Sequence, residues 1–223
     1  ECFALSPTKR LCQQIIDKKL DIKWTCEMRF EKHLTRELLA SMRDAGCLKI
    51  VFGLESFNQR VMDFMKKGIK QEWVRRIADD CVDLGIAVHC YIIVGFPTEK
   101  EEEARETMNF IVENKRLNES YGFSCQPCLF DLEKEAPIMS DPGSYGIRRI
   151  MRPSAEDLSL GFFYEVSEGM TPDESERLYQ HVYEKVSEVV CELPFNYSMA
   201  DGLLYIARAK AQEVGVPQPT GSE

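Results

Sequence analysis

Short apolar segments alternate along the first 130 residues with longer segments whose apolar residues recur every three or four positions. The short segments begin near residues 22, 48, 86 and 121, and the one at 48–54 contains a single charged residue, Lys49. Helical spacing predicts amphipathic helices, and short apolar runs predict buried strands. A strand–helix–strand order predicts a parallel sheet with right-handed crossovers. This part of the chain is therefore expected to be α/β, either doubly wound or part of a (βα) barrel.

Glycines and capping residues set the expected limits of these elements. Gly46 and Gly85 are expected to end helices, and Thr98 with Glu101 has the spacing of a capping box. We expect helices over 6–20, 35–45, 57–67, 70–84 and 98–115, and strands over 22–26, 48–54, 86–94 and 121–129. In the first helix, the face expected to pack inward is formed by Leu11, Ile15, Ile16 and Leu20.

The alternation stops after residue 130. Residues 131–153 are rich in proline and glycine and are expected to form an extended loop. Thr171-Pro172-Asp173-Glu174 predicts a helix start, and that helix is expected to reach about residue 192, before another over 200–214. The expected organisation is a barrel part over 1–130, a connecting loop over 131–153, a helical extension over 154–216 and a mobile tail over 217–223.

Composition excludes several classes of protein. Hydrophobic residues make up 44% and charged residues 29%, as in ordinary globular proteins. The net charge of −9, without a basic run, argues against nucleic-acid binding. No segment approaches the roughly 18 apolar residues that span a bilayer. The nine cysteines are odd in number and lie mostly in apolar patterns, which predicts reduced thiols and a cytoplasmic protein.

Familiar catalytic motifs are absent from the sequence. There is no glycine-rich phosphate loop, no Gly-x-Ser-x-Gly and no His-Glu-x-x-His. His33, His89 and His181 lie far apart, and each is expected to be a surface residue or a satisfied core residue. Cys125 and Cys128 form the only Cys-x-x-Cys, but a metal site normally needs a second pair of ligands. An unrelated metal-binding α/β enzyme that uses these two cysteines stays open as an alternative.

Residues able to bind a ligand follow three of the expected strands. Glu27 and Arg29 follow the first, Glu55 ends the second, and Gly95 follows the third. A carboxylate that closes a buried strand must pair with a cation or bind a ligand, because unpaired burial is costly. The residues alone leave both interpretations of Glu55 open. Gly95 serves either a tight turn or the close approach of a flat ligand, and Lys67 is either a solvated charge or a partner for a ligand carboxylate.

Three segments together resemble the radical S-adenosylmethionine (radical SAM) superfamily: Ala45–Ser56, Met65–Gly68 and Val94–Glu99. They are most similar to the branch that contains the oxygen-independent coproporphyrinogen oxidases, the methylthiotransferases and the cobalamin-binding radical SAM enzymes. The resemblance covers roughly residues 1–130, and residues 130–147 are similar to the segment that follows the barrel in the cobalamin-type branch. It implies an incomplete (βα)6 barrel and, in complete members, a 4Fe-4S cluster that cleaves S-adenosylmethionine to a radical.

The resemblance also implies roles for the residues at the strand ends. Glu27 or Arg29 would approach the ribose or methionine part of S-adenosylmethionine. Glu55, followed by Ser56, would take the ribose or polar-tail position, and Lys67 would pair with the methionine carboxylate. Ile93 and Gly95 would lie along the adenine. The implied cofactor-binding set is Glu27, Arg29, Glu55, Ser56, Lys67, Tyr91, Ile93 and Gly95.

The chain departs from the family pattern at one motif. Cys-x3-Cys-x2-Cys, which holds the cluster in family members, occurs nowhere in the 223 residues. The resemblance therefore implies the C-terminal portion of a radical SAM enzyme that is incomplete and inactive alone, with cobalamin as a further possible cofactor. Its expected partners are S-adenosylmethionine, an unknown substrate, and an upstream part of the polypeptide or a second chain that covers the open sheet edge. A truncated non-catalytic scaffold that binds a partner through that edge is the alternative.

Overall fold

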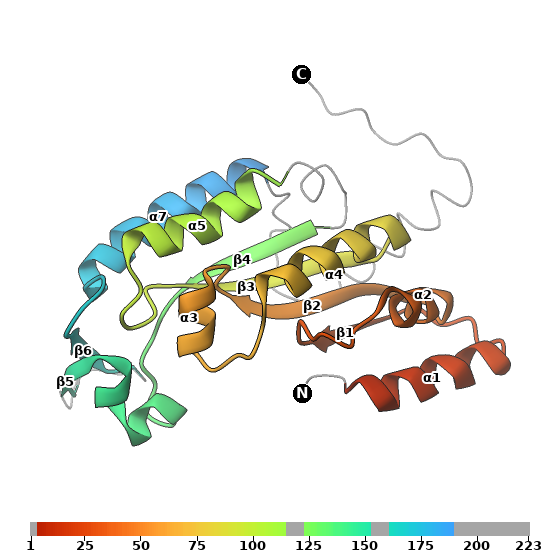
Figure 1. Ribbon diagram of the computed structural model, residues 1–223, viewed down its shortest axis with the longest axis horizontal. Coiled ribbons are helices and arrows are strands. Elements are labelled where there is room, and N and C mark those ends of the chain that lie inside the picture. Colours follow the sequence, from red (N-terminus) through yellow and green to blue (C-terminus); the bar gives the residue numbers. More distant parts are fainter. Residues whose placement is uncertain (1–3, 115–122, 153–160, 190–223) are drawn as a thin grey trace.

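The computed structural model describes residues 4–114, 123–152 and 161–189. Four strands form one parallel sheet in the order β1-β2-β3-β4, with helices between successive strands (Figure 1). The strands are β1 (Trp24–Met28), β2 (Cys47–Glu55), β3 (Ala87–Val94) and β4 (Phe123–Leu129). The helices are α1 (Leu5–Asp17), α2 (Arg36–Asp44), α3 (Gln59–Phe64), α4 (Gln71–Leu84), α5 (Glu101–Val112) and α7 (Pro172–Val189). The predicted α/β class, an incomplete barrel of parallel strands with a C-terminal helix, is confirmed.

The two faces of the sheet differ in character because alternate residues of a strand point to opposite faces. The core face packs against α2, α4, α5 and α7 in one apolar cluster, and it carries Cys26, Met28, Ile50, Phe52, Leu54, Val88, Cys90, Ile92 and Val94. The opposite face, called the inner face below, follows from the strand register and carries Thr25, Glu27, Lys49, Val51, Gly53, His89, Tyr91, Ile93, Ser124, Gln126 and Cys128. Polar residues therefore gather on the face that these helices leave uncovered.

The start of α5 differs from the predicted capping box. The helix begins at Glu101, and the carboxylate of Glu103 accepts a hydrogen bond of 2.9 Å from the backbone N–H of Lys100. Thr98 lies before the helix with a φ of 72°, in the left-handed region. The capping pair is therefore two residues later than predicted, because the turn after β3 takes up Thr98. The predicted stop at Gly85 is confirmed by its left-handed φ of 71°.

The prediction for the inward face of α1 was right for Ile15 and wrong for Leu11 and Ile16. Leu11 and Ile16 are each 38% exposed, whereas Thr8, Cys12 and Ile15 are buried. The helix packs against α2, and that contact selects the buried stripe. Among the described strands, β1 pairs only with β2, so an open sheet edge lies in the same N-terminal region.

The segment after β4 holds more regular structure than predicted. Residues 131–153 were expected to be a loop, but they contain two 3-10 turns and the strand β5. β5 pairs antiparallel with β6, which falls in the part expected to be helical. The two strands bury Ile147 and Tyr164 in a second small core, and this burial outweighs the proline and glycine content. That core is formed by Leu132, Ile138, Ile147 and Tyr164. The elements are η1 (Pro137–Ser140), η2 (Pro142–Tyr145), β5 (Ile147–Met151) and β6 (Phe163–Val166).

The long C-terminal helix agrees with its predicted start. The carboxylate of Glu174 accepts a 2.8 Å hydrogen bond from the backbone N–H of Thr171, and the Thr171 hydroxyl accepts one from the Glu174 N–H. Leu178, Val182 and Val186 are buried, and α7 lies beside α5 on the core face (Figure 1). The predicted helix over 200–214 and the tail over 217–223 lie outside the described residues.

Two further expectations concern membranes and thiols. Within the described ranges, no helix combines the length and apolarity needed to cross a bilayer. Every cysteine in these ranges is a free thiol, as predicted.

Candidate functional site

Glu55 closes β2 in a conformation that few residues with a side chain adopt. Its φ is 64°, in the left-handed region. The register between β2 and β3 shifts between Gly53 and Glu55, and such a bulge redirects a side chain. Oε1 of Glu55 lies 2.8 Å from Nζ of Lys67. Of the two interpretations left open by the sequence, the structure thus shows the pair with a lysine.

The Glu55–Lys67 pair lies over Gly53 on the inner face. A Cβ built on Gly53 would lie 2.9 Å from Oε1 of Glu55 and 3.9 Å from Nζ of Lys67. The missing side chain of Gly53 therefore leaves the space that the pair occupies. The side chains of Lys67 and Glu55 are 32% and 14% exposed. The pair is thus partly shielded from water and still open to a ligand. Gly53 was not predicted as a site residue, although a glycine two positions before a strand-ending carboxylate was visible in the sequence.

Arg29 holds the segment that carries Lys67. Its guanidinium donates a hydrogen bond to the backbone carbonyl of Lys67, which joins the end of β1 to the turn after α3. Glu27 lies two residues earlier on β1, is exposed on the inner face, and stands in register with Val51. Within the described chain, the Glu27 carboxylate has no ion pair or hydrogen bond. The structure therefore brings Arg29 to Lys67 and leaves Glu27 on the same face.

Tyr91 and Ile93 extend the inner face along β3. Tyr91 stands in register with Gly53, and its ring meets that of His89 edge-on with centroids 5.5 Å apart. Ile93 stands in register with Cys128 of β4. Burial, and then the charge of Glu55, raise the pKa of the Cys128 thiol. The predicted residues Glu55, Tyr91 and Ile93 therefore share one end of one face.

Ser56 has a different environment from the one predicted. Its side chain is fully buried, and its hydroxyl lies 3.2 Å from that of Thr107 on α5. The same hydroxyl accepts a hydrogen bond from the backbone N–H of Asn58. Ser56 thus fixes the chain after β2 to α5. The structure does not bring its side chain to the Glu55–Lys67 pair.

Gly95 lies in a turn that packs closely against α7 on the core side of the sheet. Its φ is 83°, and a Cβ there would lie 2.5 Å from Cβ of Ser175 on α7. Its backbone N–H donates a 2.7 Å hydrogen bond to the carboxylate of Glu99. The space predicted for a flat ligand is therefore taken by Ser175 on the side where a Cβ would point.

Glu99 is a buried carboxyl that the sequence reasoning missed. It is 1% exposed, and its Oε1 has no hydrogen-bond partner among the described residues. Burial raises its pKa to about 8. A carboxyl that carries a proton at neutral pH avoids the cost of a buried charge. The sequence feature that could have identified Glu99 is its position at the end of the segment Gly95-Phe96-Pro97-Thr98-Glu99.

A buried polar group lies further from the carboxyl ends of the strands. Nδ1 of His89 is 2.7 Å from the hydroxyl of Ser124 on the adjacent strand. Burial, and then the charge of Lys49, lower the pKa of His89 to about 3. His89 is therefore neutral near pH 7 and hydrogen-bonded, as predicted for a satisfied core histidine. His33 is exposed, which is the other expected environment.

The alternative metal site is not supported by the geometry. Cys125 stands in register with Cys90, and Cys128 with Ile93, so their side chains lie on opposite faces of β4. Two cysteines on opposite faces of a sheet cannot hold one ion. Across residues 4–114, 123–152 and 161–189, no group of three or more His, Cys, Asp or Glu side chains is placed to bind a metal.

Comparison with known proteins identifies the family. Residues 4–111 match the family model described as the Radical SAM superfamily. This segment belongs to the radical SAM superfamily. The resemblance stated from the sequence is thereby confirmed.

Two curated relatives match parts of the same segment. An uncharacterized methyltransferase of Pyrococcus horikoshii is 30% identical over 108 residues, which is 48% of this chain and 23% of the relative. A tRNA-2-methylthio-N(6)-dimethylallyladenosine synthase of Campylobacter concisus is 32% identical over 85 residues, which is 36% of this chain and 19% of the relative. The chain thus spans about a fifth of the length of these two curated relatives.

Solved radical SAM structures share the fold. The radical S-adenosylmethionine methyltransferase TsrM from Kitasatospora setae superposes with a TM-score of 0.54 at 17% identity, covering 77% of this chain and 34% of TsrM. Coproporphyrinogen III oxidase (HemN) from Escherichia coli gives 0.54 at 13% identity, covering 84% of this chain and 38% of HemN. At these identities, the likeness concerns the fold alone.

Proposed function

We propose that this chain supplies part of the S-adenosylmethionine site of a radical SAM enzyme, at the carboxyl ends of β1, β2 and β3. The observation that carries the proposal is the Glu55–Lys67 pair over Gly53. S-adenosylmethionine carries ribose hydroxyls that donate hydrogen bonds and a carboxylate that seeks a cation. A carboxylate beside an ammonium group offers both complementary partners. The acceptor of Glu55 and the donor of Lys67 on the inner face therefore fit the polar groups of the cofactor.

The proposed roles follow from the contacts of each residue. Lys67 would pair with the cofactor carboxylate, and Glu55 would accept hydrogen bonds from the ribose hydroxyls. Arg29 positions Lys67 through the Lys67 carbonyl, so we propose an indirect role for it. Glu27 offers a second, exposed carboxylate on β1, and Tyr91 with Ile93 offers an aromatic and apolar surface on β3. Ser56 and Gly95 hold the loops that carry this set.

The iron–sulfur cluster is a separate matter. Bound S-adenosylmethionine supplies the methyl and adenosyl groups of the family's chemistry, and a 4Fe-4S cluster cleaves it in complete members. The described residues hold no ligand group for such a cluster. We therefore assign no step through the cluster to this chain. Cobalamin stays a proposal for the branch, with no residue of the inner face assigned to it.

A binding measurement tests the proposed site. Titration calorimetry with S-adenosylmethionine would compare the wild type with Glu55→Gln and Lys67→Met. Each change removes one charged hydrogen-bond partner, so each should weaken binding by about 1–3 kcal/mol. Lys70→Met is the matched control, because Lys70 is 46% exposed and pairs with Asp63 away from the inner face. Unchanged affinity in both variants would contradict the proposal that Glu55 and Lys67 bind S-adenosylmethionine.

The open edge of the sheet favours the second candidate, a scaffold that binds a partner there. Among the described strands, β1 has no pairing on its outer side, and an unpaired edge is a template for another strand. Four large apolar side chains are exposed before β1: Leu11, Ile16, Leu20 and Ile22. Size-exclusion chromatography that shows a stable, cooperatively unfolding monomer would argue against coverage of this edge by a partner.

A further inference from the structure

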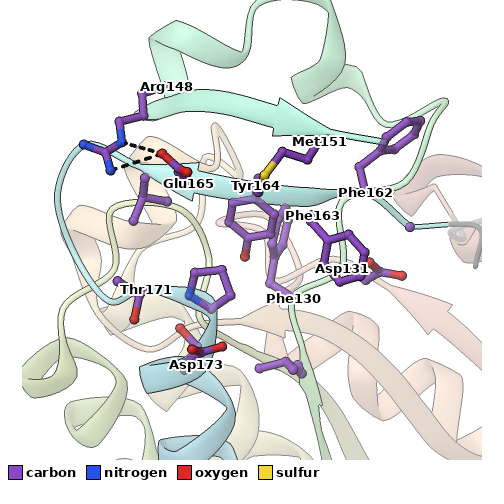
Figure 2. A pocket seen from close by; sticks show the side chains of 15 residues that line it. Phe130, Asp131, Arg148, Met151, Phe162, Phe163, Tyr164, Glu165, Thr171 and Asp173 are labelled. Carbon is purple, nitrogen blue, oxygen red and sulfur yellow. Dashed lines mark hydrogen bonds and ion pairs between the residues drawn. The ribbon is translucent and has the colours of Figure 1, made fainter. Parts of the chain in front are cut away.

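A cavity whose lining includes neither Glu55 nor Lys67 lies beyond the carboxyl end of β4. It has a volume of about 520 Å³ and lies between the β5–β6 hairpin, the end of β4 and the first turn of α7 (Figure 2). Leu129 lines it and stands in register with the core-face residue Val94, which places the cavity outside the inner face. Pockets of about 300–1,000 Å³ are typical for small organic ligands. No role in the proposed function uses this cavity.

Aromatic side chains form much of the cavity wall. The rings of Phe130 and Tyr164 meet edge-on with centroids 5.8 Å apart. Phe163 also lines the cavity and is 60% exposed, so its ring is accessible to a ligand. Figure 2 shows these rings beneath the hairpin. The wall thus offers fixed aromatic surface to a ligand.

Tyr164 also presents a polar atom to the cavity. Its side chain is 9% exposed, and the hydroxyl points away from the hairpin toward the start of α7 (Figure 2). Within the described chain, this hydroxyl has no hydrogen-bond partner. Burial, and then the charge of Asp131, raise the pKa of Tyr164 to about 12. The Tyr164 oxygen is not among the buried unpartnered polar atoms of the described residues, so it is accessible from the cavity and can accept a hydrogen bond from a ligand there.

The charge of the cavity is negative. Arg148 and Arg149 lie 3.1 and 3.5 Å from the carboxylate oxygens of Glu165, so Glu165 adds no unbalanced negative charge (Figure 2). Asp131 and Asp173 also line the cavity, and their carboxylates make no ion pair among the described residues. Two carboxylates therefore remain unbalanced beside the aromatic wall.

We propose that this cavity binds an organic cation that has an apolar or aromatic body. An ammonium or guanidinium head would lie near Asp131 and donate a hydrogen bond to the Tyr164 hydroxyl, while Asp173 lies on the other side of the Tyr164 ring (Figure 2). The body would pack on Phe130 and Phe163, where aromatic faces also attract the positive charge. This inference does not depend on S-adenosylmethionine binding, because neither Glu55 nor Lys67 lines the cavity.

Three probes with the same phenyl-butyl body separate charge from apolar contact. The probes are 4-phenylbutylamine, 4-phenyl-1-butanol and 5-phenylpentanoate, which are a cation, a neutral molecule and an anion at pH 7. Binding to the full chain would be measured by titration calorimetry. We expect one-site binding of the amine that is about tenfold tighter than that of the alcohol, and no binding of the acid.

Variants locate the binding site. Asp131→Asn and Tyr164→Phe should each weaken amine binding by about three- to tenfold. Asp131→Asn should leave the affinity for the alcohol unchanged, while Phe163→Ala should weaken both. Asp131 and Phe163 are exposed, so these changes should leave the fold intact, as circular dichroism would check. Asp44→Asn is the matched control, because Asp44 is an exposed carboxylate on α2 that pairs with Arg43.

Two results would overturn the proposal. One is an amine that does not saturate the wild-type protein or binds no better than the alcohol. The other is amine binding that Asp131→Asn, Tyr164→Phe and Phe163→Ala all leave unchanged, because the cation would then bind elsewhere. Loss of S-adenosylmethionine binding in Lys67→Met with amine binding intact would show that the two sites are separate.

Discussion

The ammonium group of Lys67 and the carboxylate of Glu55 meet 2.8 Å apart above Gly53, a residue without a side chain. Glu55 ends a strand and Lys67 follows the next helix, so the contact depends on the turn between them. Arg29 holds that turn from the end of β1. Three successive elements therefore fix one ion pair at the edge where parallel strands place ligands.

Gly53→Ala should displace the ion pair without removing its charges. The new Cβ would lie 2.9 Å from Oε1 of Glu55, so the carboxylate must move. We expect S-adenosylmethionine binding to weaken by about 1–2 kcal/mol, and the free energy of unfolding to change by less than about 1 kcal/mol. Titration calorimetry and urea unfolding measure the two quantities. Gly143→Ala is the control, because a Cβ there meets nothing closer than 3.9 Å. An unchanged affinity in Gly53→Ala would show that the position of the carboxylate is irrelevant to binding.

Ser56→Ala should lower stability and leave cofactor affinity unchanged. The change removes a buried hydroxyl and leaves the Thr107 hydroxyl and the Asn58 N–H without that partner. We expect the free energy of unfolding to fall by about 1–3 kcal/mol. Ser140→Ala is the control, because its hydroxyl bond to the Pro137 carbonyl is exposed. A large loss of S-adenosylmethionine affinity in Ser56→Ala would restore the role that the resemblance implied.

Glu99→Gln should remove a decline of stability with rising pH. The folded pKa of Glu99 is about 8, above the ordinary 4.5, so between these values the folded state holds a proton that the unfolded state has lost. The free energy of unfolding of the wild type should therefore fall as pH rises from about 5 to 8, by about 3 kcal/mol from this group. Gln keeps an acceptor for the Gly95 N–H and does not titrate. Urea unfolding at three pH values measures the slope, and equal slopes in both proteins would contradict the buried protonated carboxyl.

His89→Gln should reduce a loss of stability that the wild type shows as pH falls. The folded pKa of His89 is about 3, below the ordinary 6.5, so the unfolded state takes up a proton first as pH falls. The stability contributed by neutral His89 is complete above about pH 6.5 and should decline by about 2 kcal/mol by pH 4.5. The same unfolding series should show a smaller acid loss in His89→Gln. His33→Gln, at an exposed position, should keep the acid loss of the wild type.

The sheet could be predicted from the sequence because buried strands and helix stops have strong local signals. The apolar run of β2 and the glycine stop at Gly85 each depend on neighbouring residues, and both agree with the structure. The buried side of α1 depends on its contact with α2, so Leu11 and Ile16 were assigned wrongly. The β5–β6 pairing joins residues that are separated in sequence, and no local pattern predicted it.

The candidate site was predictable in part for the same reason. The positions of Glu55 and Lys67 at element ends indicated chemistry, but their contact required the bulge at Gly53. Ser56 lies next to Glu55 in sequence, yet the turn directs its hydroxyl to α5. Burial of Glu99 is a tertiary property, so its raised pKa could not be inferred from the residues.

A crystal structure with S-adenosylhomocysteine, which keeps the ribose and the methionine carboxylate, tests the central claim most directly. We predict the ligand on the inner face, with its carboxylate at Lys67 and its ribose hydroxyls at Glu55. An intact Glu55–Lys67 pair with the ligand bound elsewhere, for example in the cavity beside Tyr164, would contradict the account.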